Sequence, residues 1–115
     1  MIWLEKQTDK GVLKYRMPNA LEIYDILEDS GFTSGIKSPL KLKRNVVSLL
    51  DKYIDFSGIE GANSFEEILN MTESMIIPLG EIADEIMNKS FMAFKKKTSS
   101  ETPSTSLKTD GVEKN

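Results

Sequence analysis

The stretch from residue 64 to residue 94 constrains the fold most, because it carries the strongest helical pattern in the chain. It opens with Ser64 followed three residues later by Glu67, a capping box in which each side chain satisfies a backbone donor at a helix start. Apolar residues then recur at helical spacing and cover roughly half of the helix circumference. They are Leu79, Ile82, Ala83, Ile86, Met87, Phe91 and Phe94. Such a wide face indicates a helix that lies deep in a bundle or keeps part of its face for a partner.

Pro78 interrupts this pattern. Because proline lacks the N–H of an interior helix bond, we expect either a kink near Ile77 or a helix that begins near Pro78 after a looser turn. Asn19 and Ser38 are favourable N-cap residues for two earlier helices. The chain is therefore predicted to be helical over residues 19–30, 39–54, 64–71 and 75–95.

The same periodicity predicts which side chains form the core. In the first helix, the inward side is predicted to hold Ala20, Ile23, Tyr24 and Leu27. The residues predicted to be largely buried are Ile23, Leu27, Val46, Leu50, Ile68, Leu79, Ile82 and Ile86. In the loop between residues 55 and 63, Phe56 and Ile59 are expected to return to this core.

Residues 1–17 are predicted to form a β-hairpin, with Gly11 adopting the positive φ that a tight turn requires. An isolated hairpin is only marginally stable, so we expect Trp3, Leu13 or Tyr15 to pack against helices or the hairpin to pair with a neighbouring subunit. The predicted architecture is a mainly α protein, a small bundle of about four helices with this hairpin, in one domain at residues 1–97. Residues 98–115 contain almost no apolar side chains and are predicted to be a disordered tail.

Composition excludes several classes of function. The 115-residue chain has no cysteine and no histidine, which removes disulfides, thiolate metal sites and the commonest general base. No serine or threonine has an evident base partner, so we predict a non-enzymatic protein without a cofactor. Residues 1–94 carry 10 Lys and Arg against 15 Asp and Glu, a net charge of −5 that argues against nucleic acid as the main partner. No apolar run is long enough for a membrane span, and the expected location is the cytoplasm.

Two groups of charged residues have a spacing that is found in functional sites. Glu81, Asp84 and Glu85 have the helical spacing that can place carboxylates around a metal. They fall on the polar side of their helix and no histidine can join them, so we predict a solvated face and no metal site. Lys43 and Arg44, with Lys41 beside them, crowd the first turns of a helix, where cations oppose the helix dipole. They form either a solvated face or a contact with an acidic partner.

Four of the six methionines fall at or near the last predicted helix, at positions 71, 75, 87 and 92. Methionine fills irregular cores, and it also recurs on surfaces that bind varied partners. The predicted partner-binding residues on the wide apolar face are Met75, Met87, Phe91 and Met92. Both interpretations, core filler and binding surface, are open at this point.

Four segments resemble tail assembly chaperones of long-tailed bacteriophages. They are the hairpin, Met-Pro-Asn-Ala-Leu-Glu at residues 17–22, and the pair Ser-Phe-Glu-Glu-Ile-Leu and Ile-Pro-Leu-Gly-Glu-Ile-Ala-Asp-Glu-Ile at residues 64–69 and 77–86. The resemblance covers Trp3 to about Phe94 and is one of layout, without a catalytic motif.

This resemblance implies a non-enzymatic protein that acts in the host cell cytoplasm. It would bind the tape measure protein, keep this long apolar helical polymer soluble, and help tail tube subunits assemble around it, with self-association also expected. Many members have a longer form made by ribosomal frameshifting, and the lysine run at residues 95–97 is compatible with a slippery site. Two alternatives are a small phage or bacterial regulatory module that binds one specific protein and an enzyme subunit without an active site of its own.

Overall fold

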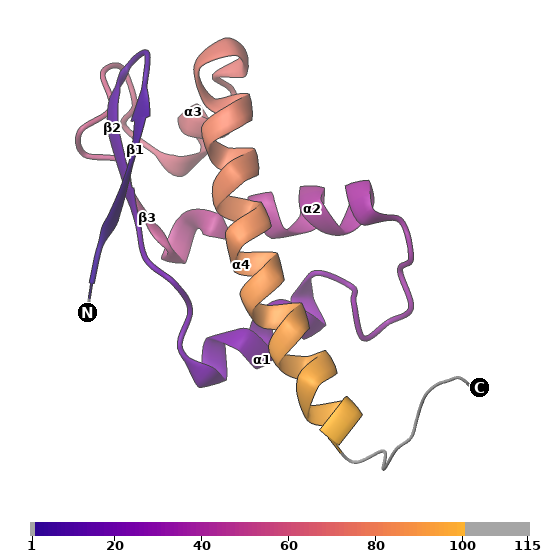
Figure 1. The fold of residues 1–115 in the computed structure, drawn as a ribbon. Helices are drawn as coiled ribbons and strands as arrows, with labels where there is room; N and C mark the ends of the chain where they lie inside the picture. The colour runs from indigo at the N-terminus through magenta and orange to yellow at the C-terminus, as the bar shows by residue number, and fades with distance from the viewer. Residues whose placement is uncertain (1, 101–115) are drawn as a thin grey trace.

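The protein is mainly helical, with a small antiparallel sheet on one side. The computed structural model describes the backbone of residues 2–100 and the side chains of residues 2–92. In Figure 1 the long helix α4, Thr72–Ser100, runs through the centre of the molecule, and the sheet lies to one side of it. Helix α2, Pro39–Ser48, runs across α4 and extends beyond it on the other side, with α1, Ala20–Asp29, below.

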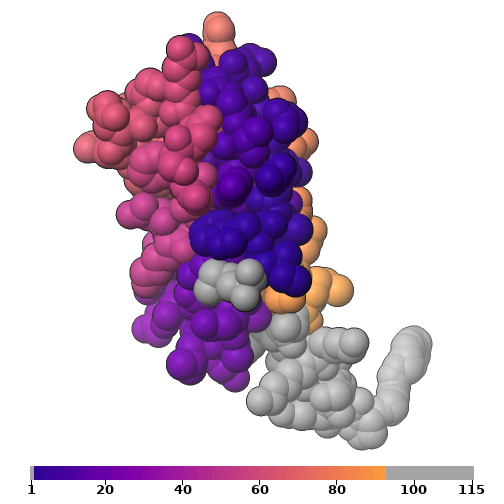
Figure 2. Space-filling view, turned by 90° about the vertical axis from the view of Figure 1, so that its left-hand side faces the viewer, coloured from indigo at the N-terminus to yellow at the C-terminus, as the bar shows by residue number. Residues whose placement is uncertain are grey.

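The predicted hairpin is confirmed. Strands β1, Leu4–Thr8, and β2, Gly11–Tyr15, pair antiparallel with Thr8 opposite Gly11. Gly11 has a φ of +129°, and a Cβ built there would lie 2.1 Å from the carbonyl oxygen of Gly58. The segment that follows β3 can therefore approach the hairpin closely, and Figure 2 shows the two side by side. The backbone N–H of Glu60 donates to the carbonyl of Lys10 at 2.8 Å across this contact.

A third strand makes the sheet larger than predicted. Helix α2 ends at Ser48, a 3₁₀ turn spans Leu50–Lys52, and β3, Ile54–Asp55, pairs antiparallel with β2 in the order β1-β2-β3. The predicted helix over residues 39–54 is therefore wrong in its last third. The open edge of β2 explains the difference, because the N–H of Arg16 donates to the carbonyl of Tyr53 at 2.8 Å. Pairing with this edge outweighs the helical spacing of the local apolar residues.

The predicted helix starts are confirmed by their capping bonds. Asn19 and Glu22 form a complete capping box at α1. The Ser38 hydroxyl accepts from the N–H of Lys41, with Pro39 in the first turn of α2. At α3, Phe65–Leu69, the Ser64 hydroxyl accepts from the N–H of Glu67. The Glu67 carboxylate reaches back one residue further than in the usual box and accepts from the N–H of Asn63 at 2.7 Å.

Helix α4 begins earlier and ends later than predicted. It runs from Thr72 through Pro78 to Ser100, so the predicted looser turn before Pro78 is wrong. Pro78 is buried, and its ring takes the place of an N–H that would otherwise donate to the carbonyl of Ser74. The last three helical residues, 98–100, fall at the start of the predicted disordered tail. The rest of that predicted tail, residues 101–115, lies outside the described residues.

The core lies between α4, α2 and the inner face of the sheet. Of the residues predicted to be buried, all but Ile23 are at most 5% exposed. Leu13, Tyr15 and Ile59 bring the sheet and the loop into the same cluster, and Phe56 packs against it as predicted. Trp3 is 41% exposed, so Leu13 and Tyr15 anchor the hairpin.

The inward side of α1 differs from the prediction. Ala20 and Tyr24 are exposed and Ile23 is only half-buried, whereas Ile26 and Leu27 are buried. The predicted and observed faces have the same helical spacing and share Ile23 and Leu27, so periodicity alone cannot choose between them.

An ion pair joins the end of β2 to the start of α1. The Arg16 guanidinium donates to both carboxylate oxygens of Glu22, at 2.8 Å each, and lies 5.0 Å from the centre of the Tyr53 ring. The hydrogen bond from Arg16 lowers the pKa of Glu22 from 4.5 to about 2. Burial is the main cause that raises the pKa of Tyr53 to about 12.

The first prediction tests the core. Leu50→Ala and Ile82→Ala should each lower the free energy of unfolding by about 2–5 kcal/mol, because both side chains are fully buried. Leu21→Ala is the matched control, since Leu21 is 77% exposed, and it should change stability by at most about 0.5 kcal/mol. Urea denaturation followed by circular dichroism measures all three. Equal effects of the three substitutions would contradict this packing.

The second prediction concerns acid. The folded-state pKa of Glu22, about 2, lies below its ordinary value of 4.5. The carboxylate therefore contributes stability that is fully present above pH 4.5 and is lost as the pH falls toward 2. The difference in unfolding free energy between the wild type and Glu22→Gln should be largest near neutral pH and should shrink across this window. A difference that stays constant from pH 7 to pH 2 would show that the ion pair with Arg16 contributes nothing.

Candidate partner-binding site

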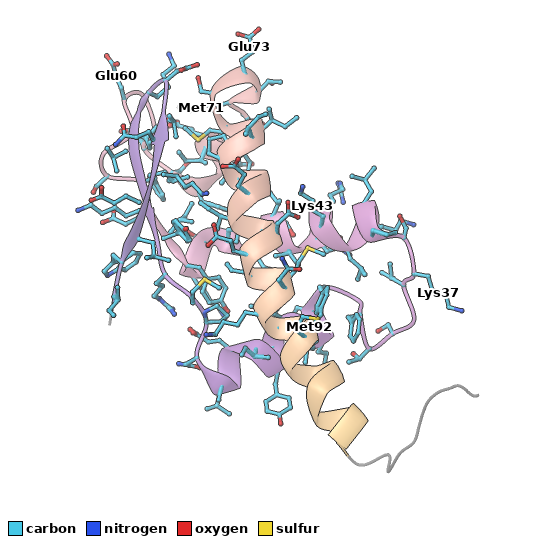
Figure 3. All side chains as sticks on the ribbon, in the orientation of Figure 1. Lys37, Lys43, Glu60, Met71, Glu73 and Met92 are labelled. Carbon is cyan, nitrogen blue, oxygen red and sulfur yellow. The ribbon has the colours of Figure 1, made fainter. Side chains whose placement is uncertain are left out.

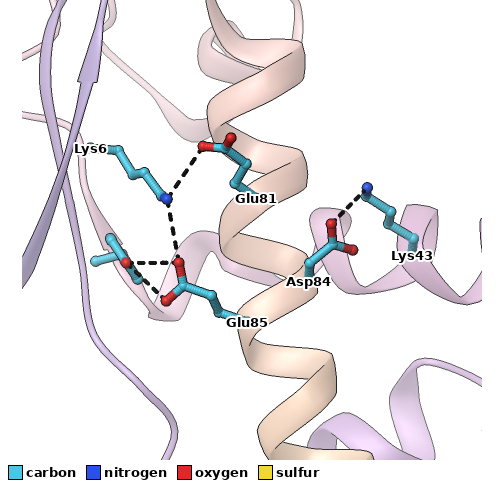
Figure 4. A network of polar contacts seen from close by, with 6 residues as sticks. Lys6, Lys43, Glu81, Asp84 and Glu85 are labelled. Carbon is cyan, nitrogen blue, oxygen red and sulfur yellow. Dashed lines mark hydrogen bonds and ion pairs between the residues drawn. The ribbon is translucent and has the colours of Figure 1, made fainter.

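The acidic residues of α4 take part in ion pairs that orient neighbouring elements. Lys6 of β1 contacts both Glu81 and Glu85 at 3.3 Å, as Figure 4 shows. The Tyr15 hydroxyl donates to Glu85 at 2.9 Å, and its burial together with this bond raises the pKa of Tyr15. The side chains of Glu81 and Glu85 are 55% and 41% exposed, as expected for the predicted solvated face, and they also tie the hairpin to α4.

On the other side of α4, Asp84 pairs with Lys43 of α2 at 3.2 Å. Within the described residues, no group of three or more carboxylates lies close enough together to hold a metal ion. The ion pairs in this part of the molecule hold the hairpin and α2 against α4.

The four predicted binding residues do not share one surface. Met75 is fully buried, so it is a core residue in this fold. Met87 is half-buried against the core, and the ring of Phe91 stacks on Phe32 at 4.5 Å between centroids. Met92 is 61% exposed, and Figure 3 shows it well below Met71, which lies near the start of α4. Met75 and Phe91 are 16 positions apart, about 24 Å along the helix axis.

The structure instead has an apolar groove where α2 crosses the first half of α4. Its volume is about 480 Å³. Residues of α2 line one wall and residues from the end of α3 to the middle of α4 line the other. The lining residues are Leu40, Lys43, Arg44, Val47, Leu69, Met71, Thr72, Met75, Ile76, Leu79 and Gly80. We call this surface the α2–α4 groove.

The α2–α4 groove has a buried floor and an exposed apolar rim. Met75 and Leu79 form the floor and are 0% and 5% exposed. Leu40 and Ile76 stand on opposite walls and are 77% and 66% exposed. Large apolar side chains that face solvent around a concave surface are typical of a docking site.

Gly80 lets Lys43 cross the groove close to the backbone of α4. A Cβ built at Gly80 would lie 3.4 Å from both Cε and Nζ of Lys43. The aliphatic part of Lys43 therefore covers the glycine while its ammonium group reaches Asp84, and Figure 3 shows the side chain beside α4.

A second hollow of about 660 Å³ lies at the start of the chain. Ile2, Leu4 and Met17 line it together with Arg16 and Asn19. Its polar groups already serve the fold, because Arg16 binds Glu22 and Asn19 caps α1. The α2–α4 groove is the stronger candidate, since its exposed apolar side chains come from two helices that are far apart in the sequence and meet in the fold.

The sequence held a partial signal for this groove. Leu40, Lys43, Arg44 and Val47 stand at positions i, i+3, i+4 and i+7, which is one face of a helix. That face lies beside the stripe of Leu42 and Val46 that packs into the core. The sequence does not show that this face of α2 lies against α4. The crossing of the two helices in the structure does.

Together these features define a class, a mainly helical protein with a three-stranded sheet and an exposed apolar groove. We find no matching family model, no matching curated protein and no matching solved structure. Within residues 2–100, none of the helices combines the length and the apolar character that crossing a membrane requires.

The third prediction concerns Gly80. Glycine inside a helix costs about 1 kcal/mol relative to alanine, and the neighbouring Lys43 end is flexible enough to move. Gly80→Ala should therefore raise the free energy of unfolding by about 0.5–1 kcal/mol, measured by urea denaturation. The gain should persist in a Lys43→Ala background. A loss of stability that disappears in that background would show that the contact between Lys43 and the α4 backbone matters more than helix propensity.

Proposed function

We propose that this protein is a non-enzymatic tail assembly chaperone that holds apolar helical segments of a tape measure protein in the α2–α4 groove. The observation that carries the proposal is the exposed apolar rim, with Leu40 and Ile76 on opposite walls of one groove. The class of partner is taken from the resemblance in sequence, and the groove is the surface proposed to hold it.

A helix is the occupant that this groove favours. Laying the apolar face of one helix into a hydrophobic groove is a common mode of recognition, and it needs no catalytic group. Full burial of an exposed leucine or isoleucine contributes roughly 1.5–3 kcal/mol, so Leu40 and Ile76 can anchor a partner. A helix in the groove would rest on both α2 and α4 and cover both residues.

The methionines of the groove support a chaperone over a regulator of one specific protein. The half-buried Met71 and the buried Met75 line it together, and unbranched side chains of this kind can repack beneath partners of different shape. A tape measure protein presents many apolar helical segments of different sequence. An adaptable floor suits repeated, reversible binding along such a polymer.

The proposal extends to a role of this protein in the assembly of the tail. The protein would act in the host cell cytoplasm, binding the tape measure protein until tail tube subunits replace it. A frameshifted longer form would add its extra domain beyond α4, at the far end of the helix from the groove. Self-association through Met92 on the exposed side of α4 is a separate proposal.

The fourth prediction tests the groove directly. Ile76→Glu should reduce the soluble fraction of a co-expressed tape measure protein, and should weaken binding to its helical fragments about tenfold or more. Ile77→Glu is the matched control, because Ile77 is the next residue, is 64% exposed and does not line the groove. Both variants should keep the melting temperature of the wild type, which circular dichroism checks.

Met92→Glu, in the same assay, tests the surface that the sequence favoured. If it abolishes solubilisation while Ile76→Glu does not, the binding surface lies at the other end of α4. If only one unrelated protein binds and tape measure fragments do not, the chain is a regulatory module and the chaperone proposal is wrong.

A further inference from the structure

We infer that the α2–α4 groove selects an acidic amphipathic helix and that Arg44 is the residue that sets this preference. The inference rests on the proposed function, because it assigns a charge to the helix that the groove would hold. A charge preference would decide which segments of a partner bind. It would also make binding depend on salt, which apolar contacts alone do not.

The charged residues that line the groove are both cations. Lys43 and Arg44 lie side by side in α2, and no carboxylate joins them in the lining. Helix α2 itself carries Lys41, Lys43 and Arg44 and no acidic residue. Since residues 1–94 have a net charge of −5, this wall is a basic region on an acidic protein.

The two cations differ in what they already bind. Lys43 is paired with Asp84 at 3.2 Å, so its charge is partly compensated within the fold. Arg44 is exposed, and within residues 2–92 it makes no ion pair with any carboxylate. Its guanidinium can therefore bind a carboxylate of a partner, and its planar fork favours a two-bond contact.

The spacing along α2 sets where that carboxylate should stand. Arg44 follows Leu40 by one helical turn, so the apolar anchor and the cation lie on the same wall. A helix packed against this wall needs an apolar residue opposite Leu40 and an acidic residue about one turn away. An amphipathic helix whose apolar stripe is bordered by Glu or Asp meets both conditions.

Nucleic acid fits the same region poorly. A polyanion needs several cations over an extended surface, whereas this groove is mainly apolar and the protein around it is acidic. One available guanidinium beside an apolar floor can bind a single carboxylate, and an amphipathic helix can present that carboxylate next to its apolar stripe.

The experiment uses the full-length chain and two designed helical peptides. The peptides share one apolar stripe and differ only in the residues that border it, glutamate in one and lysine in the other. Fluorescence polarisation measures the dissociation constants at low and high ionic strength. The acidic peptide should bind roughly fivefold more tightly at low salt, and the difference should shrink near 1 M salt, where charges are screened within about 3 Å.

Two substitutions on α2 separate a local contact from a change in net charge. Arg44→Glu should remove or reverse the preference for the acidic peptide. Lys41→Glu changes the net charge by the same amount at an exposed residue outside the groove lining, and it should leave most of the preference in place. Glutamate is also tolerated in the first turn of a helix, so this control should fold.

Each outcome supports or overturns the inference. If both peptides bind equally, or if Lys41→Glu has the effect of Arg44→Glu, the charge preference is refuted while the groove stands as a helix-binding site. If neither peptide binds, the proposed function fails together with the inference. If a single-stranded oligonucleotide competes for the groove more strongly than the acidic peptide, the partner is not a helix and the inference is wrong.

Discussion

The burial of one face of α4 is the interaction on which the rest of the structure depends. Helices α1, α2 and α3 and strand β1 all contact this helix. Its residues Leu79, Ile82 and Ile86 supply the apolar surface that each of these short elements needs. None of them is long enough to be stable alone, because short helices and isolated hairpins are marginal in water. The fold is therefore a set of short elements arranged around one long helix.

Ion pairs then favour one orientation of those elements on α4. Lys6 fixes the hairpin through Glu81 and Glu85, and Lys43 fixes α2 through Asp84. Such exposed pairs contribute little stability, about 0–1 kcal/mol each, but they favour one arrangement over others. Because α2 is held across α4 rather than alongside it, the two helices leave a corner that their own side chains do not fill. The groove is a consequence of this crossing.

Features that depend on neighbouring residues in the sequence were predicted correctly. Features that depend on tertiary contacts were not. The caps at Asn19, Ser38 and Ser64 and the core side of α4 depend on neighbouring residues, so spacing was sufficient to find them. Strand β3 forms because β2 offers an open edge, which no local pattern records. The four residues predicted to bind a partner lie apart in the structure for a related reason. The sequence shows the wide apolar face of α4, but which part of that face is covered depends on where α2 packs and on the segment between α1 and α2, whose Phe32 stacks on Phe91.

Met75 belongs both to the core and to the floor of the groove, so folding and partner binding share a side chain. A ligand that binds only the folded state increases its stability by mass action, about 2.7 kcal/mol when present at a hundredfold excess over its dissociation constant. An occupant of this groove would do so by extending the hydrophobic core. The lifetime of the protein against cellular proteases would then follow the supply of its partner, and unused copies would be removed first.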